Sequence, residues 1–169
     1  MLILNVNGPI NAGKTTVSKL LCQSLSDALF VEVDDLLSDK EEARLGLSTE
    51  DGWKERIDRL EKIVFQKKAD QSCRVLIFAY PITREYYDRW KGYEDGRTRF
   101  VNITLSPSLE HCLTNRGTRE LTEWELDRIR RMYAEHYHDP DFSDLIVHND
   151  DRTPEQTARV VLDFLKEIA

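Results

Sequence analysis

One short motif near the start of the chain constrains its fold more than any other feature. Residues 8–15 read GPINAGKT and match the pattern G-x-x-x-x-G-K-[ST] at every position. Residues 1–7 read as a buried strand, and residues 16–21 open a helix with apolar side chains at helical spacing. Strand, glycine-rich loop and helix in this order predict a phosphate-binding loop, and they argue against the alternative of a chance Gly-Lys-Thr in a turn.

The motif assigns a role to most of its groups. In such a loop the backbone N–H groups of residues 9–15 turn inward, and the following helix N-terminus adds partial positive charge around the β-phosphate. We expect Lys14 to bridge the β- and γ-phosphates of ATP, and the Thr15 hydroxyl to bind Mg²⁺. The residues expected to contact the nucleotide here are Gly8, Asn11, Ala12, Gly13, Lys14, Thr15 and Thr16.

The composition indicates one acidic domain spanning residues 1–169. The chain has 169 residues and a net charge of -7, which argues against a nucleic-acid-binding surface. No apolar run approaches the roughly 18 residues of a membrane span, and residue 1 leads directly into a strand, so we expect a cytoplasmic protein with no membrane partner. Cys22, Cys73 and Cys112 are widely spaced, which indicates reduced, structural thiols.

Predicted strands and helices alternate along the chain. Strands are expected at residues 1–7, 28–34, 74–79, 99–105 and 144–148. Helical periodicity is present around residues 53–64, 126–133 and 158–165, and residues 122–125 and 153–156 read as helix capping boxes. This alternation predicts an α/β fold of three layers, in which helices cover both faces of a five-stranded parallel sheet.

The segment 37–52 is the one stretch without clear periodicity. It includes the charged run 38–42, which reads SDKEE. One interpretation makes it part of a cap over the acceptor site, covering about residues 37–68. The other interpretation is a solvated surface loop.

Three acidic residues, Glu32, Asp34 and Asp35, follow the core of the second predicted strand. Ligands of parallel sheets collect at the carboxyl ends of the strands. We therefore expect Asp34 to hold or deprotonate an acceptor hydroxyl in line with the γ-phosphate, and Glu32 to support Mg²⁺. In the alternative interpretation, Asp34 and Asp35 only cap the following segment.

The end of the third predicted strand carries no acidic residue that could bind Mg²⁺. It offers Tyr80, Thr83 and Arg84 as possible contacts to the acceptor. An ion pair of Arg84 with Glu85 or Asp88 on an exposed helix is an alternative interpretation with equal support.

Arginines between the fourth and fifth predicted strands indicate a lid over about residues 115–125. Arg116 and Arg119 lie in a segment that joins two helices, from which their guanidinium groups could reach the transferring phosphoryl group. After the fifth strand, Arg152 belongs to the loop 148–154, which could hold the adenine and also caps the next helix.

Taken together, these motifs resemble the small-molecule kinases of the nucleoside-monophosphate-kinase-like group of phosphate-loop proteins. Residues 30–34 are similar to the Phe-x-Asp-x-Asp strand ending of shikimate kinases, with Glu32 in place of the first aspartate. Residues 116–119 and 152–155 look like the C-terminal half of chloramphenicol phosphotransferases, and residues 75–82 look like tunicamycin-resistance proteins.

The resemblance implies a sheet order of 2-3-1-4-5 and an arginine-bearing lid. It implies Asp34 as the catalytic or substrate-orienting carboxylate, and Arg116 and Arg119 as lid and adenine-proximal arginines. The arginine and glycine constellation with which shikimate kinases hold their substrate's carboxylate is not recognisable.

The function expected from residues and resemblance together is an ATP-dependent transfer of the γ-phosphoryl group to a hydroxyl of a small metabolite or antibiotic. A nucleoside or nucleotide kinase is a second possibility, although no arginine cluster follows the third strand to hold a monophosphate. A non-catalytic ATP-binding switch is the third. The chain lacks the Asn-Lys-x-Asp tetrapeptide expected of a GTPase. No motif identifies the acceptor or the oligomeric state.

Overall fold

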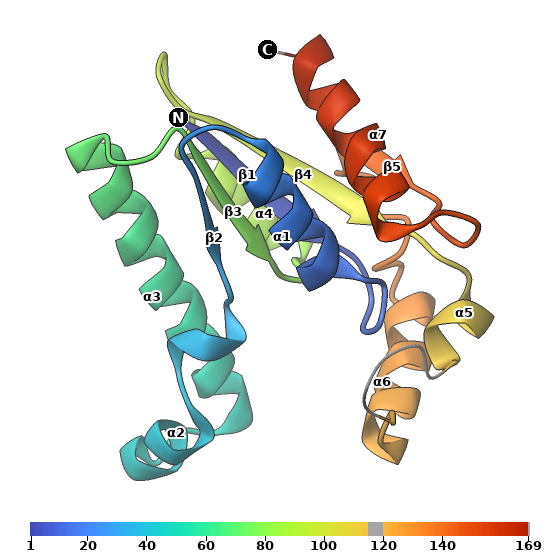
Figure 1. Ribbon diagram of the computed structural model, residues 1–169. Helices are drawn as coiled ribbons and strands as arrows, with labels where there is room; N and C mark the ends of the chain where they lie inside the picture. Colours follow the sequence, from blue (N-terminus) through green and yellow to red (C-terminus); the bar gives the residue numbers. More distant parts are fainter. Residues whose placement is uncertain (115–119, 169) are drawn as a thin grey trace.

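The computed structural model, which describes residues 1–114 and 120–168, has a parallel five-stranded sheet at its centre (Figure 1). The strands are β1 (Leu2–Asn7), β2 (Ala28–Val31), β3 (Val75–Ala79), β4 (Arg99–Leu105) and β5 (Leu145–Val147). They lie in the order β2-β3-β1-β4-β5, and every neighbouring pair is parallel. The predicted α/β class and the strand order implied by the resemblance are confirmed.

Helices cover both faces of this sheet and extend beyond its carboxyl edge (Figure 1). They are α1 (Lys14–Ser24), the short 3₁₀ helix η1 (Asp34–Leu36), α2 (Asp39–Leu45), α3 (Thr49–Asp70), α4 (Arg84–Lys91), α5 (Leu109–Leu113), α6 (Glu123–Ala134) and α7 (Pro154–Glu167). None of the helices in the described ranges is both long and apolar enough to cross a membrane.

Alternation along the strands divides the apolar side chains between two cores. On β1, Leu4 and Val6 belong to the core that includes α1 and α7, whereas Ile3 belongs to the core that includes α3 and α4. Successive side chains of a strand point to opposite faces, so a central strand must be apolar on both. Trp90 of α4 is fully buried in the second core, where its ring lies 5.2 Å from that of Phe78.

Two buried asparagines of β1 fix the backbone that follows β3. Asn5 donates from Nδ2 to the carbonyl oxygen of Tyr80 at 3.0 Å and accepts from the Tyr80 N–H at 3.1 Å. Asn7 accepts from the N–H of Ile82 at 3.1 Å and donates to Thr104 Oγ1 at 2.8 Å. Buried amides are stable only when they are bonded in this way, so the pair sets the course of the chain beyond β3. Residues 1–7 were predicted to form a buried strand, and the role of these two asparagines was not predicted.

The segment 37–52 is helical, and the prediction that it is irregular was wrong. Ser38 caps α2 by accepting from the N–H of Glu41, and Ser48 caps α3 by accepting from the N–H of Asp51. Gly46 ends α2 with a φ of 63°, a left-handed conformation that glycine adopts without strain. The two helices therefore follow one another with a short turn between them.

Candidate active site

The P-loop, residues 8–15, leaves the carboxyl end of β1 and enters α1 through several left-handed residues. The φ angles are 136° at Gly8, 65° at Asn11 and 92° at Gly13. Positive φ angles turn successive N–H groups toward one side of the chain, which is how backbone forms an anion-binding concavity. Ala12 is fully buried, and its N–H donates to the carbonyl of Pro9 at 3.3 Å. The loop that the motif predicts is present.

Helix α1 begins without the side-chain cap that every other described α-helix has. The other six start after a serine or threonine whose side chain accepts a backbone hydrogen bond. These capping residues are Ser38, Ser48, Thr83, Ser108, Thr122 and Thr153. The caps at Thr122 and Thr153 are the two predicted capping boxes. The N-cap of α1 is Gly13, which has no side chain. The N–H groups of the first turn of α1 therefore lack a side-chain acceptor, and a phosphate is the group that this end of a helix favours.

The Lys14 amine is enclosed by its own loop. Its Nζ donates to the carbonyl oxygen of Pro9 at 2.7 Å. Burial lowers the pKa of Lys14 to about 8, and the neighbouring groups Cys112, Asp34 and Glu32 oppose that shift. The structure thus brings the P-loop lysine close to the acidic end of β2.

Strand β2 ends at Val31, earlier than the predicted residue 34, and Asp34 begins η1. The turn is closed by hydrogen bonds from the N–H of Asp35 to the Glu32 carbonyl at 3.3 Å and from Leu36 to Val33 at 3.1 Å. Ser38 caps the next helix, so the interpretation in which the aspartates serve only as its cap is not supported. Both Asp34 and Asp35 are exposed.

Glu32 and Thr15, the two predicted metal ligands, lie near one another. Burial and Asp34 raise the pKa of Glu32, and the nearby Thr15 side chain opposes that rise. Hydroxyl and carboxylate oxygens are the ligands that Mg²⁺ prefers, so the pair fits this ion. The described residues form no group of three or more acidic, histidine or cysteine side chains that could hold a metal ion. Mg²⁺ would therefore need phosphate and water oxygens as well.

The residues after β3 divide between structural and possible acceptor-binding roles. Thr83 caps α4. Arg84 pairs with Asp141 at 2.7 Å and lies 4.0 Å from Asp88, which agrees with the ion-pair interpretation, although the nearer partner is one that the sequence analysis did not name. Tyr80 is half-buried and close enough to Asp34 for that carboxylate to contribute to the rise in its pKa, which burial dominates.

Comparisons with known proteins now bear on this site. No protein-family model and no curated protein matches the sequence. Solved structures match it over nearly its full length. Shikimate kinase from Aquifex aeolicus is 20% identical, with 99% of this chain and 98% of that chain covered and a TM-score of 0.58. Gluconokinase from Sinorhizobium meliloti is 19% identical, with coverage of 99% and 92% and a TM-score of 0.64. The tunicamycin resistance protein of Deinococcus radiodurans is 18% identical, with coverage of 96% and 94% and a TM-score of 0.62.

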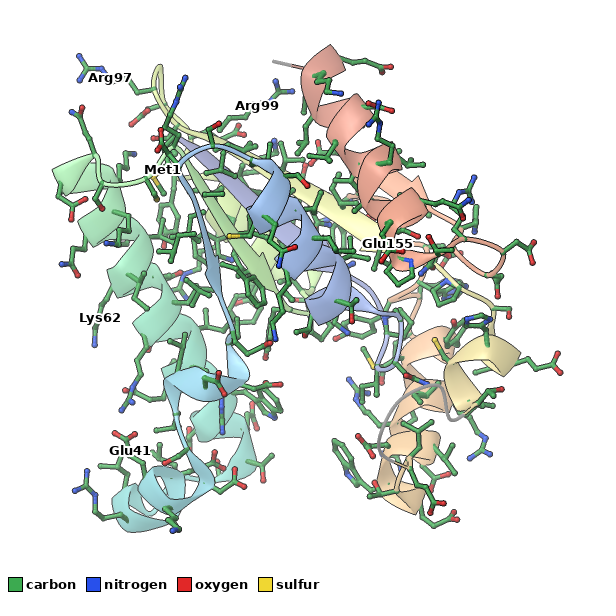
Figure 2. All side chains as sticks on the ribbon, viewed as in Figure 1. Met1, Glu41, Lys62, Arg97, Arg99 and Glu155 are labelled. Carbon is green, nitrogen blue, oxygen red and sulfur yellow. The ribbon has the colours of Figure 1, made fainter. Side chains whose placement is uncertain are left out.

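The chain has the fold of the P-loop small-molecule kinases. At these identities the likeness is one of fold, and it agrees with the fold that the resemblance implies. In this kinase fold, the P-loop and the acidic end of β2 lie at the carboxyl edge of the sheet. Figure 2 shows Met1, Arg97 and Arg99 at the opposite, amino edge.

Two asparagines, one within the P-loop and one from the loop after β5, brace the P-loop against neighbouring segments. Asn11 donates from Nδ2 to the carbonyl oxygens of Cys112 and Thr114, both at 2.9 Å. The buried Asn149 donates to the carbonyl of Ala12 at 3.1 Å. The side chain of Asn11 thus holds the loop, and the contact of its backbone N–H with the nucleotide remains a prediction. The contribution of Asn149 was missed, because nothing in the sequence indicates which residue of the loop 148–154 faces the P-loop.

Arg152 lies in the loop between β5 and α7, where its guanidinium donates to the carbonyl of His148. It borders a pocket of about 830 Å³ between α1 and α7, whose walls include Leu20 and Val160. Glu155, labelled in Figure 2 at the start of α7, lies on the same rim. A contact between Arg152 and the nucleotide remains a prediction.

The predicted lid arginines, Arg116 and Arg119, lie outside the described residues. Of the predicted lid range, 115–125, the structure describes only residues 120–125, and Glu123 begins α6 there. The lid and the contacts of both arginines to the nucleotide therefore remain predictions.

Two glycines of the loop should respond differently to substitution by alanine. At Gly8 the new methyl group would lie 2.5 Å from the backbone oxygen of Leu105 and would also impose an unfavourable φ, so we expect a destabilisation of about 3 kcal/mol. At Gly13 no atom lies within 4 Å of that position, and only the φ is unfavourable, so about 1 kcal/mol is expected. Urea unfolding of Gly8→Ala and Gly13→Ala measures both changes in the free energy of unfolding. Equal costs at the two positions would contradict the close approach of β4.

Proposed function

We propose that this protein transfers the γ-phosphoryl group of ATP to a hydroxyl of a small metabolite or antibiotic. The observation that carries the proposal is the meeting of Lys14, Thr15, Glu32 and Asp34 at the carboxyl edge of the sheet. Phosphoryl transfer requires positioning and neutralisation of charge more than covalent chemistry, and this group provides an amine, a hydroxyl and two carboxylates for that purpose.

The proposed reaction proceeds by displacement at the γ-phosphorus. The acceptor oxygen forms a bond to phosphorus while the bond from phosphorus to the departing oxygen of ADP breaks. The acceptor proton passes to the Asp34 carboxylate, which holds the hydroxyl in line. The backbone N–H groups at the start of α1 and the Lys14 ammonium hold the phosphate oxygens, where negative charge develops.

Thr15 and Glu32 would hold Mg²⁺, with nucleotide phosphates and water as further ligands. The ion would neutralise charge on the β- and γ-phosphates. The nearness of Thr15 to Glu32 supports this assignment, because the Thr15 side chain is close enough to influence the pKa of the Glu32 carboxyl.

The surrounding segments suit this reaction. Residues 37–68, which form α2 and most of α3, would cover the acceptor, and residues 115–125 with Arg116 and Arg119 would close over the nucleotide. We propose one domain over residues 1–169 that acts in the cytoplasm on a small-molecule partner rather than on nucleic acid or a membrane. A nucleotide kinase is disfavoured, because Arg84, the arginine that follows β3 in the sequence, is paired with Asp141.

The test is the release of ADP from Mg-ATP with a panel of hydroxyl acceptors that includes nucleosides, antibiotics, sugar acids and shikimate. Acceptor-dependent turnover that disappears in Lys14→Ala would support the proposal. Tight binding of Mg-ATP without ADP release for any acceptor class would favour a non-catalytic binding protein instead.

A further inference from the structure

We infer that the acceptor is an uncharged alcohol with a planar aromatic ring, and that Trp53 and Tyr80 hold this ring beside Asp34. The inference rests on the proposed function, because it assigns a substrate class to the same site. The fold alone does not determine the acceptor, since neither the P-loop nor the sheet order depends on which alcohol is bound.

Tyr80 places one aromatic ring next to the proposed catalytic carboxylate. Its backbone is held on both sides by Asn5, so the ring has a fixed origin directly after β3. Asp34, Tyr86 and Tyr137, the last from beyond α6, are all close enough to contribute to the rise in the pKa of its hydroxyl. A ring in this position borders the space in which an acceptor must lie to reach Asp34.

Trp53 adds a second ring from the first turns of α3. Its centroid lies 5.8 Å from that of Tyr80, with the two planes tilted by 50°. The guanidinium of Arg56 lies over the Trp53 ring, 5.0 Å from its centroid. Trp53 is nevertheless 39% exposed, although a tryptophan would gain by burial. A planar ligand stacked on the exposed part of the ring would remove it from water and would add an offset or edge contact.

The charges around the two rings indicate an uncharged acceptor. Arg56 is only 7% exposed, and its guanidinium donates to Glu42 at 2.8 Å and to the carbonyl of Leu37 at 2.8 Å. It thus supports Trp53 and already has a carboxylate partner. Arg84, on the α4 side, is paired with Asp141. In the proposed complex Lys14 holds the nucleotide phosphates, so a carboxylate on the acceptor would find Asp34 close by and no unpartnered arginine on α3 or α4. Its binding would therefore be disfavoured.

Matched pairs of acceptors test this inference. Phenyl β-D-glucoside and methyl β-D-glucoside offer the same hydroxyls and differ in one ring, and uridine and methyl β-D-riboside form a second pair. Shikimate and gluconate represent anionic acceptors without an aromatic ring. Affinity is measured by calorimetry on the full chain loaded with Mg²⁺ and a non-hydrolysable ATP analogue, and ADP release is measured separately with Mg-ATP.

We expect the aromatic member of at least one pair to bind about 10-fold more tightly than its aliphatic partner. Trp53→Ala should remove most of that difference and Trp53→Phe should retain part of it, because stacking on an aromatic ring accounts for about a factor of ten. Phe65→Ala is the matched control, since Phe65 is an exposed aromatic residue of the same helix, 44% exposed and in edge-to-face contact with Tyr93. It lies twelve residues further along α3, about 18 Å from Trp53 along the helix axis.

Two results would overturn the inference. One is equal affinity within every pair, including no measurable binding of any member. The other is an aromatic preference that Trp53→Ala leaves unchanged while its thermal unfolding matches that of the parent chain. Binding does not depend on turnover, so an aromatic preference without ADP release would count against the proposed kinase activity and leave the assignment of the binding site in place.

Discussion

Replacing Asp34 with asparagine should lower turnover by about 100-fold or more while leaving the affinity for Mg-ATP nearly unchanged. Asparagine keeps the shape of the side chain but cannot accept the acceptor's proton. Asp34 is exposed at the start of η1, and the structure places it near both Lys14 and Tyr80. In the proposed reaction it would lie between the nucleotide phosphates and the acceptor. Steady-state kinetics and nucleotide titration of Asp34→Asn measure the two quantities separately.

Asp35→Asn is the matched control for this experiment. Asp35 is the next residue of η1, is equally exposed and carries the same charge. A general loss of negative charge at the strand end would affect both variants, whereas a positioned catalytic carboxylate makes only Asp34→Asn inactive. Loss of Mg-ATP affinity in Asp34→Asn, or equal turnover in the two variants, would show that Asp34 has a different role.

The fold could be predicted because its strongest signals are local. Strand β4 was predicted with its exact limits, Arg99–Leu105, since its central residues are apolar or buried and Ser106 and Pro107 follow it. Strand β2 was predicted three residues too long. Val33 continues the apolar alternation of the strand, but its backbone is helical with φ -66° and ψ -36°. Periodicity does not distinguish a strand end from a 3₁₀ turn of similar composition.

Signals for α2 were present in the sequence and were overlooked. Ser38 and Ser48 each precede an acidic first turn, and Gly46 stands where a helix would end. The charged run suggested a loop because its stabilising partners lie on another helix. Glu41 and Glu42 bind Arg59 and Arg56 of α3, at 2.9 Å and 2.8 Å. Such tertiary ion pairs cannot be read from a single sequence.

The parts of the site that could not be predicted are those in which polar side chains hold backbone groups far away in the chain. Asn5 and Asn7 point to the same face of β1, a spacing that is visible in the sequence. Their partners, however, are Tyr80 for Asn5 and Ile82 for Asn7, each 75 residues further along the chain. Asn149 is 137 residues from its partner Ala12. These contacts follow from strand order and register, which only the complete fold determines.

Replacing Lys14 with alanine should lower acceptor-dependent turnover by on the order of 1,000-fold. The variant loses the cation that is proposed to hold the β- and γ-phosphates. The protein should nevertheless fold. Burial lowers the pKa of Lys14, which means that the folded state disfavours its charged form, so removing the amine should not lower the stability of the nucleotide-free protein.

Thermal unfolding with and without Mg-ATP separates these two effects. The parent chain should show a nucleotide-dependent rise in Tm, since a ligand that binds only the folded state stabilises it. For Lys14→Ala we expect an unchanged or higher Tm without nucleotide and little further rise with it. Lys19→Ala provides the comparison. Lys19 is exposed on the same helix, and its positive charge also influences the pKa of Glu32. If Lys19→Ala lost the nucleotide response to the same extent, the general positive charge of α1 rather than the enclosed amine would be responsible for binding the phosphates.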